Sequence, residues 1–259
     1  MQYFGFDRTL GQMRTFGFGL LEWLPTELFQ NNEQGVWYDP SDISSMYQDA
    51  AMTIPVTAHG DPVGAMMDLS GNGNHATQSV SASRPTYQTD GFLHWLQFDG
   101  VDDNLAHPYS SGTSNLTLAA SGATTTNSGR QQIIGAGAAG NKLTSLVWIR
   151  VNNADSWGTY STTDKATGDS ALNTPIVMIN VGNHASEVQK LYTNGQLTAS
   201  FTGIFQGDSN DRRYIGSERA SSSFMQGRIY GIAGLGREIT ESELFSLNKY
   251  LATKSGVTL

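Results

Sequence analysis

The sequence predicts an all-β protein, an antiparallel β-sandwich with an N-terminal extended arm and one C-terminal amphipathic helix. From residue 35 onward, short runs of aromatic and β-branched residues alternate with turn residues, a pattern typical of strands. Glycine accounts for 29 of the 259 residues, above the usual share of about 7%, which indicates many tight turns. Residues 1–34 lack this pattern. We therefore expect two parts, an arm over residues 1–34 and a sandwich over residues 35–259.

The arm is rich in aromatic side chains, as in "FGFDRTLGQMRTFGFGLLEWLPTELF", and shows neither strand alternation nor helical spacing. An apolar segment without a partner strand needs another surface to cover it. One interpretation is an arm that docks on a neighbouring chain, and the other is a leader that packs on its own sandwich. The sequence leaves both open.

Three strands stand out inside the sandwich. Residues 92–98 ("FLHWLQF") and 146–151 ("LVWIRV") are rich in aromatic and β-branched side chains. Residues 175–181 ("PIVMINV") are apolar on both faces, which indicates a central strand. Trp95 and Trp148 lie inside such runs, so we expect them in the core.

The rest of the sandwich contains one clear hairpin and one long polar stretch. In "EVQKLYTNGQLTASF", Asn194 and Gly195 supply the positive φ angles of a type I′ turn. The runs "RRYIG" and "GRIYGIAGL" continue the series of strands. Residues 109–129 are polar and simple in composition, so we expect one short strand over 116–119 and loop elsewhere.

A single helix is predicted at the C-terminus, in "ITESELFSLNKYLATKSG". Thr240 is a good N-cap, and Glu243 stands three residues on, as a capping box requires. Gly256 supplies the stop. One face of the helix is lined by Leu244, Leu247 and Leu251.

Charged residues make up 15% of the chain, the net charge is −8, and there is no cysteine. A chain this acidic lacks a basic surface for nucleic acid or anionic membranes. The apolar run over residues 16–24 contains Glu22 and ends at Pro25, so it does not span a bilayer. The N-terminus also lacks the pattern of a secretory signal peptide. We expect no nucleic-acid partner, no membrane insertion and no disulfide.

The run "MMDLSGNGNHAT" raises the question of a metal loop. Asp68 and Asn72, followed by Gly73, match the first half of an EF-hand loop, but the twelfth position is Ser79 instead of glutamate. No lysine follows the glycines, as a phosphate-binding loop requires. A hydrogen-bonded turn built on Asp68 is the favoured interpretation, and an oxygen-lined calcium site is the alternative.

A second acidic cluster, Asp99, Asp102 and Asp103, lies in "FDGVDDN". The favoured interpretation is a turn with Gly100 at its corner. The alternative is calcium ligation, with Asp68 brought close by strand pairing.

The sequence predicts no enzyme. Glycoside hydrolases need two carboxylates at a defined separation, and the predicted strands carry no such pattern. The acidic run "EITESE" is explained by the helix start. No nucleophile elbow of the form G-x-S-x-G occurs. The five histidines lack zinc-site spacing; they are His59, His75, His94, His107 and His184.

One stretch has the composition of a sugar-binding loop, "NNADSWGTYSTTDKATGD". An exposed aromatic ring covers the apolar face of a sugar, and amides or carboxylates bind its hydroxyls. The alternative is that Trp157 folds back and fills the edge of the sandwich. The candidate glycan-binding residues are Asn152, Asn153, Asp155, Trp157, Tyr160 and Asp164.

Several motifs in order resemble the laminin-G-like, concanavalin A-like sandwich family, which implies a jelly-roll fold. They are "DLSGNGNHAT", "LQFDGVDDNL", "LYTNGQL", "YIGSE" and "GRIYGIAGLGREITESELFSLNKYLA", and they cover residues 35–259. The opening "GVWYDPSDISSMYQDAAMTIPVTAHGDPVGAMMDLSGNGNHATQ" resembles a subgroup found in virion proteins of tailed bacteriophages.

The resemblance implies a non-enzymatic phage virion protein, on the tail rather than the head, made in the host cytoplasm without a signal peptide. Its expected partners are other virion proteins, through residues 1–34, and a host cell-surface glycan or protein. Fibres of this kind are often trimers, so a homo-oligomer is expected. No cofactor is required, and a structural calcium at the acidic runs is the alternative described above. The alternatives are a purely architectural head-decoration or tail-assembly subunit and, least favoured, a polysaccharide hydrolase.

Overall fold

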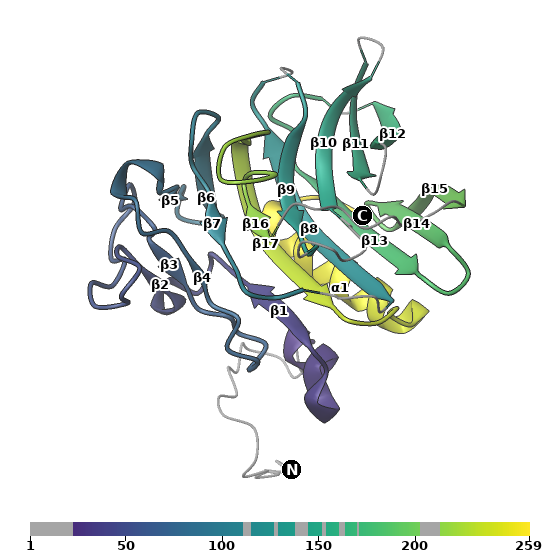
Figure 1. Ribbon diagram of the computed structural model, residues 1–259, viewed down its shortest axis with the longest axis horizontal. Coiled ribbons are helices and arrows are strands. Elements are labelled where there is room, and N and C mark those ends of the chain that lie inside the picture. Colours follow the sequence, from purple (N-terminus) through teal and green to yellow (C-terminus); the bar gives the residue numbers. More distant parts are fainter. Residues whose placement is uncertain are drawn as a thin grey trace, which may run out of the picture.

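Two antiparallel sheets stack face to face in this computed structural model, and one helix covers the outer face of the first sheet (Figure 1). The structure describes residues 23–110, 115–126, 129–137, 145–151, 154–160, 164–169, 171–202 and 213–259. The predicted antiparallel β-sandwich with one C-terminal helix is confirmed. Within the described ranges, no helix is long and apolar enough to cross a membrane.

The first sheet, sheet A, has the strand order β15-β14-β13-β8-β17-β6-β5, and β1 pairs with the far half of β17. The predicted central strand is confirmed, because β13 lies between β8 and β14. The strands of sheet A are β1 (Gly35–Tyr38), β5 (Thr86–Thr89), β6 (His94–Asp99), β8 (Leu116–Thr124), β13 (Ile176–Asn183), β14 (Val188–Thr193), β15 (Gln196–Thr202) and β17 (Gln226–Leu235).

The second sheet, sheet B, has the strand order β12-β11-β10-β9-β16-β7-β4-β3-β2. Its strands are β2 (Met46–Tyr47), β3 (Ala65–Met66), β4 (Ala76–Thr77), β7 (Leu105–Ala106), β9 (Gln131–Gly135), β10 (Ser145–Val151), β11 (Ala154–Tyr160), β12 (Asp164–Asp169) and β16 (Tyr214–Ile215). In the part of the chain that the structure describes, the helices are three 3-10 helices, η1 (Pro25–Asn32), η2 (Ile43–Ser45) and η3 (Ser81–Ser83), and the α-helix α1 (Glu241–Ser255).

Strand β8 is longer than the sequence predicted, and all nine of its residues are buried. The polar stretch was expected to hold a strand only over residues 116–119. Leu118 and Ala120 face the core between the sheets, whereas Ala119 belongs to the cluster beneath α1. Small residues suit a strand that is covered on both faces, because a helix can then pack closely on it. The small residues that make this stretch weakly hydrophobic allow close packing, and they do not indicate a loop.

Helix α1 forms where the sequence predicted it. The Thr240 side chain accepts a hydrogen bond from the Glu243 backbone N–H at 3.3 Å, and the Glu243 carboxylate accepts one from the Thr240 N–H at 2.7 Å. Gly256 ends the helix in the left-handed conformation, with φ 73°. The helix packs on β8, β13 and β17, and Leu247 and Leu251 are buried.

The hairpin turn between β14 and β15 is also confirmed. Asn194 has φ 48° and Gly195 has φ 80°, the left-handed conformations that the type I′ turn requires. The Asn194 side chain accepts a hydrogen bond from the Val177 N–H at 2.9 Å, which fastens the turn to β13.

The described part of the predicted arm packs on its own sandwich. Leu28 and Phe29 of η1 are buried in the cluster under α1, and Trp23 meets the Tyr250 ring edge-on at 6.3 Å. Arg237 joins this segment to the helix, because its guanidinium contacts Glu33 at 3.0 Å and Glu243 at 2.6 Å. Residues 1–22 lie outside the described residues, so docking of this segment on a neighbour remains a prediction.

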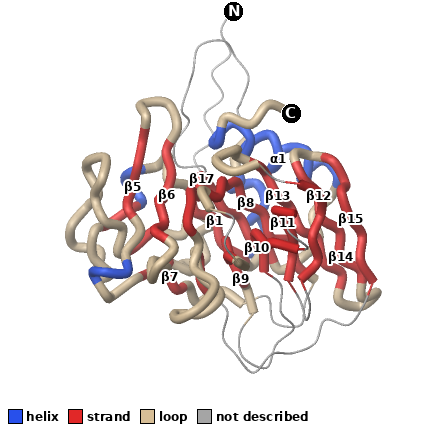
Figure 2. The backbone as a smooth tube through the Cα atoms, turned by 90° about the horizontal axis from the view of Figure 1, so that it is seen from above, coloured by secondary structure: helices blue, strands red, loops and turns tan. Residues whose placement is uncertain are grey.

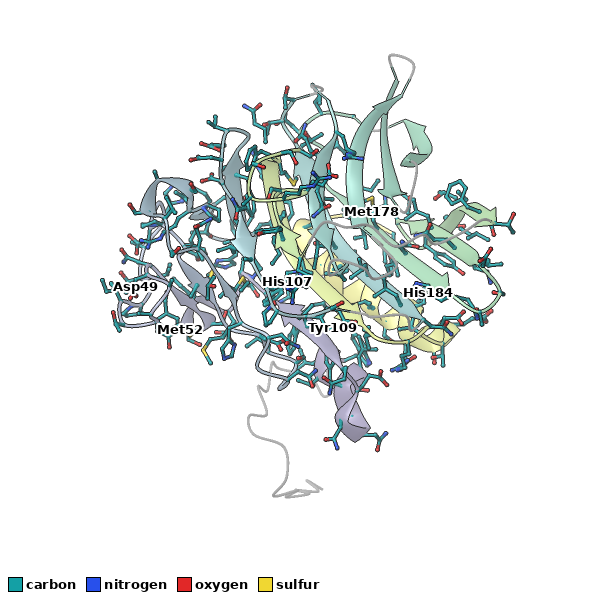
Figure 3. The ribbon with its side chains drawn as sticks, viewed as in Figure 1. Asp49, Met52, His107, Tyr109, Met178 and His184 are labelled. Carbon is teal, nitrogen blue, oxygen red and sulfur yellow. The ribbon has the colours of Figure 1, made fainter. Side chains whose placement is uncertain are left out.

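Three stacked or tilted rings, Tyr38, His107 and Tyr109, connect β1 to the segment after β7. The rings of Tyr38 and His107 lie 6.4 Å apart, and His107 stacks on Tyr109 at 6.5 Å. Figure 3 shows His107 and Tyr109 beside β1, at the middle of the molecule. His107 is buried, and its Nε2 donates a hydrogen bond to the Gly135 carbonyl at 2.9 Å. Its role here is to fill and connect the interior.

Candidate functional site

The run from Met66 to Thr77 is a hydrogen-bonded turn that clamps the start of β1. The Asp68 carboxylate accepts bonds from the Trp37 N–H at 2.9 Å, the Ser70 N–H at 3.0 Å and the Asn74 N–H at 3.0 Å. The Ser70 hydroxyl donates to the same carboxylate at 2.7 Å. A carboxylate with so many protein donors is occupied as a structural acceptor, as the turn interpretation predicted.

The asparagines of this run serve the same clamp. Asn72 Nδ2 donates to the Glu33 carbonyl at 3.0 Å, and Asn74 Nδ2 donates to the Gly35 carbonyl at 2.9 Å. Gly71 and Gly73 have φ 89° and 75°, which side chains rarely adopt. Asp68 and Asn72 were candidate calcium ligands; in the structure both side chains tie the loop to the β1 segment, and calcium binding by them stays a prediction.

The second acidic cluster does assemble. One carboxylate oxygen from each of Asp99, Asp102 and Asp103 lies within 4.8 Å of the others. Among the described residues this is the only group of three or more histidine, cysteine, aspartate or glutamate side chains with metal-binding proximity. Asp68 does not belong to it, so the expected approach of Asp68 to this cluster is wrong. The reason is that Asp68 is committed to β1.

Asp103 is the buried member of the cluster. Its carboxylate accepts a hydrogen bond from the Asp99 N–H at 2.9 Å, while Asp102 accepts one from the Ser83 hydroxyl at 2.8 Å. Burial, together with the negative charges of Asp99 and Asp102, raises the pKa of Asp103 to about 7. The turn interpretation accounts for these bonds, and the crowded carboxylates leave calcium as a proposal.

The predicted sugar-binding loop is a pair of strands. Asp155, Trp157 and Tyr160 lie in β11, and Asp164 lies in β12 at the edge of sheet B. The loop prediction is wrong because polar residues in an edge hairpin resemble a loop in composition. Asn152 and Asn153 lie outside the described residues.

The strand register divides these residues into two groups. Positions 157 and 160 are an odd number of residues apart in β11, so they belong to opposite faces of the sheet. Tyr160 is the direct cross-strand partner of Asp164, and Trp157 is the partner of Thr167. Asp155 and Trp157 share the other face. Positions 155 and 157 thus lie on the face of β11 opposite to position 160.

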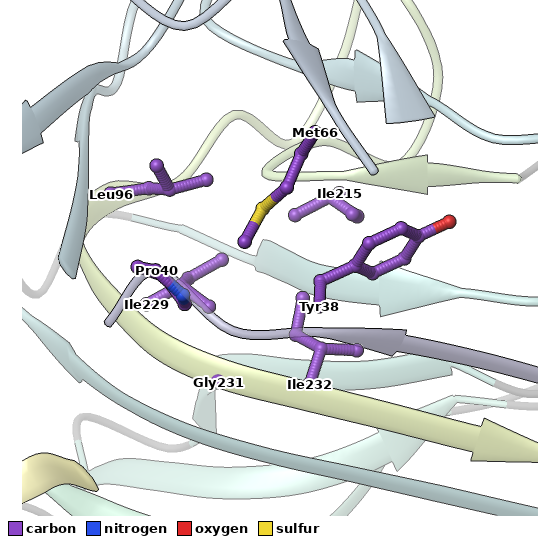
Figure 4. A pocket seen from close by; sticks show the side chains of 8 residues that line it. All are labelled: Tyr38, Pro40, Met66, Leu96, Ile215, Ile229, Gly231 and Ile232. Carbon is purple, nitrogen blue, oxygen red and sulfur yellow. The ribbon is translucent and has the colours of Figure 1, made fainter. Parts of the chain in front are cut away.

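One small void lies among the described residues. The void seen in Figure 4 lies between the sheets and measures about 10 Å³, roughly the space of one water. Its lining is apolar, which leaves a water without partners. The lining residues are Tyr38, Pro40, Met66, Leu96, Ile215, Ile229, Gly231 and Ile232. This void is a packing defect of the core and is too small for a ligand.

Trp95 differs from its predicted place in the core. It is only half-buried and lies on the outer face of sheet A, where its ring contacts Tyr230 at 5.9 Å and the Arg228 guanidinium at 5.1 Å. The contact between Trp95 and Arg228 was not predicted from the sequence, because the two residues meet only through the pairing of β6 with β17. Strand alternation was the available signal, because neighbouring residues face opposite sides of a sheet and Leu96 faces the core.

No protein-family model matches the chain, and neither does any curated protein. Among solved structures, Trypanosoma rangeli sialidase in complex with 2,3-difluoro-KDN matches with a TM-score of 0.57 and 16% identity, over 85% of this chain and 32% of the sialidase chain. The same sialidase with 2,3-difluorosialic acid matches with a TM-score of 0.57 and 15% identity, over 94% and 35%. The chain thus spans about a third of the sialidase chains. A weaker match is the Ruminococcus gnavus IT-sialidase CBM40, with a TM-score of 0.43 and 16% identity over 53% of this chain and 84% of that one.

This finding corrects one prediction. The expectation that the chain is not an enzyme is wrong as stated, because its fold matches part of sialidases, which are glycoside hydrolases. Carboxylate spacing along predicted strands is no basis for excluding activity, since separate loops bring such groups together. At 15–16% identity the likeness shows the fold alone. The chain has an antiparallel two-sheet β-sandwich fold, which it shares with part of these sialidases.

Proposed function

We propose that this sandwich binds a carbohydrate, with the β11–β12 hairpin as the contact surface. The observation that supports it best is the register of the hairpin, which sets Tyr160 directly opposite Asp164 at the edge of sheet B. Directly opposite positions in an antiparallel pair have Cβ atoms about 4.5–5.5 Å apart. An aromatic ring and a carboxylate at that spacing match the apolar face and the hydroxyls of one sugar ring.

Trp157 and Asp155 form a second, separate pair two positions apart on the other face of β11. They support binding of a further sugar unit around the sheet edge. The alternative in which Trp157 fills the sandwich predicts that its loss weakens folding and leaves binding intact.

A binding experiment with matched variants tests this proposal. The full chain is titrated with a panel of neutral and acidic oligosaccharides, together with Tyr160→Ala and Asp164→Asn. Thr159→Ala, in the same strand, serves as the control. The expected result is saturable binding that each of the two variants weakens about tenfold, the loss of a good polar or stacking contact. Equal affinity of all variants would remove the hairpin from the proposal, and product analysis would show whether a bound saccharide is cleaved.

At a finer level we propose that the glycan belongs to a bacterial surface and that the chain is a receptor-binding protein of a phage tail. The support is the resemblance of residues 35–78 to phage virion domains and the aromatic composition of residues 1–22. Labelled antibody on a purified particle tests the location. Label on the head, with adsorption unaffected by the hairpin variants, would favour the architectural alternative.

A bound calcium at Asp99, Asp102 and Asp103 is a separate proposal. Three oxygen ligands at close range suit this cation. Its charge would offset the burial and the repulsion from Asp99 and Asp102 that together raise the pKa of Asp103. Calcium that raises the thermal stability of the wild type, and not of Asp103→Asn, is the expected result.

A further inference from the structure

The outer face of sheet A carries a polar and aromatic surface at β5, β6 and β17. In the ladder Trp95 is paired with Gln88, and Gln97 is paired with Arg228. Paired positions and alternate positions share one face of a sheet. The neighbouring positions, Leu96 among them, face the core between the sheets. These four side chains therefore all point away from the sandwich.

This face is not covered as the rest of the sheet is. Helix α1 packs mainly on β8, β13 and β17, and Figure 2 shows β5 and β6 to one side of it. Gln88, Trp95, Gln97 and Arg228 are all half-buried, in contrast to the fully buried strand β8 under the helix. We call these four residues the β6 face.

Arg228 is held in place without an acidic partner. Its guanidinium lies over the Trp95 ring at 5.1 Å, a cation–π contact that orients the planar group. Within the described residues, its side chain has no hydrogen bond or ion pair. An arginine without an acidic partner is notable in a chain with net charge −8. The carboxylate of Asp99, two positions along β6 from Gln97, is engaged by the backbone N–H groups of Val101 and Asp102.

Two buried donors on this face lack an acceptor. Trp95 Nε1 and Arg228 Nε are each buried and have no hydrogen-bond partner among the described residues. Buried donors without acceptors are costly and need an explanation such as an absent ligand. The two terminal nitrogens of Arg228 are not among these buried atoms, and the side chain as a whole is half-buried.

Gln97 and Gln88 complete the surface. Gln97 Nε2 donates to the Gly227 carbonyl at 3.0 Å and to the Phe98 carbonyl at 3.1 Å, which fixes its amide beside Arg228. Gln88 Nε2 donates to the Thr86 hydroxyl at 3.0 Å. With the amide nitrogens used in this way, the side-chain carbonyl oxygens are left to accept hydrogen bonds from hydroxyl groups.

We propose that the β6 face binds the carboxylate of an acidic saccharide. The Arg228 fork takes the carboxylate in a two-bond contact, the geometry for which guanidinium is suited, and the glutamines accept sugar hydroxyls. The proposal rests on the carbohydrate-binding function and adds a second site and a ligand class to it. The site is distinct from the β11–β12 hairpin, which lies at the edge of the other sheet.

The test compares two ligands that differ only in the carboxylate. The full chain is titrated with an oligosaccharide of uronic acid and with its carboxyl-reduced, neutral counterpart. The variants are Arg228→Gln, Arg228→Lys, which keeps the charge and removes the fork, and Trp95→Phe, which removes the Nε1 donor. Lys190→Gln, an exposed cation on β14 of the same sheet, is the control. Thermal unfolding checks that each variant folds.

The expected result is binding of the acidic ligand that Arg228→Gln weakens about ten- to hundredfold, the range for a lost charged hydrogen-bond pair. The affinity of Arg228→Lys for the acidic ligand is expected to lie between those of the wild type and Arg228→Gln. The affinity of Lys190→Gln is expected to match that of the wild type. Equal affinity for the acidic and reduced ligands, or binding that Arg228→Gln leaves unchanged, overturns the proposal. If Tyr160→Ala abolishes binding and Arg228→Gln does not, the hairpin site stands and the β6 face fails; the reverse result removes the hairpin alone.

Discussion

At the scale of single residues, Asp68 joins two segments that are far apart in the sequence. Its carboxylate accepts bonds from the backbone of Trp37 in β1 and from Ser70 and Asn74 in its own turn. Removing an acceptor leaves buried donors unsatisfied, which costs about 1–3 kcal/mol for each group. The β1 junction therefore depends on this one carboxylate.

Asp68→Ala is expected to lower the free energy of unfolding by about 3 kcal/mol or more, since several N–H groups lose their acceptor. Denaturant unfolding measures it. Asp42→Ala is the matched control, because Asp42 caps only the exposed Ser44 turn. A loss no larger than that of the control would contradict the clamp.

Asp103 makes stability depend on pH. Because burial raises its pKa to about 7, the folded chain keeps a proton that the unfolded chain releases near its ordinary pKa of about 3.9. The stabilising contribution is thus complete below about pH 4 and is lost as the pH rises through about 7.

Asp103→Asn keeps an oxygen that accepts the Asp99 N–H bond and removes the titration. We expect the melting temperature at pH 8.5 to rise by about 2–4 °C, the effect of about 1 kcal/mol in a domain of this size. At pH 4 the wild type and the variant should melt together. Thermal scans across this range in the presence of a chelator decide it, and a variant with an unchanged pH profile would refute the assigned titration.

Residue roles were predictable from sequence only where partners are close along the chain. The Asp68 turn is such a case, because the hydrogen-bond donors Ser70 and Asn74 follow Asp68 within one short run. The stack of Trp95 on Arg228 is not, because the two residues are more than a hundred positions apart and meet through strand register. Burial of Asp103 likewise depends on packing that composition does not encode.

At the scale of elements, α1 and the Asn194–Gly195 hairpin were predicted because their signals are local. A capping box, a C-terminal glycine and a two-residue turn each need only a few consecutive residues. Residues 120–124 of β8 and the strands β11 and β12 were missed because their residues are small or polar. Their structure comes from neighbouring strands, which local propensity does not report.

Thr240→Ala removes the N-cap of α1 and is expected to destabilise the protein by about 1 kcal/mol. Chemical unfolding with a helix-sensitive probe measures it. Thr253→Ala, an exposed threonine in the same helix, should change stability much less. Equal effects of the two variants would mean that the capping box contributes nothing beyond helix propensity.

At the scale of the whole molecule, the boundary between arm and sandwich lies earlier than residue 34. Leu28 and Phe29 are part of the core under α1, and Glu33 pairs with Arg237. A chain that starts at residue 35 loses these contacts, whereas one that starts at residue 23 keeps them.

We expect the chain shortened to residues 35–259 to be less stable than the chain shortened to residues 23–259 by about 3 kcal/mol or more, from two buried apolar side chains. Urea unfolding of both fragments measures the difference. Equal stability would show that residues 23–34 are dispensable and would restore the arm to its predicted length. Assembly assays on particles belong with the fragment that keeps residues 23–34, because it retains the contacts of Leu28, Phe29 and Glu33.

Binding of carbohydrate is the claim on which the functional proposals depend. Isothermal titration of the full chain with the panel of neutral and acidic oligosaccharides tests it most directly. Saturable binding of at least one saccharide, strongest for a carboxylated one, is the predicted result. Absence of saturable binding to every member of the panel, by a chain that thermal unfolding shows to be folded, would contradict it.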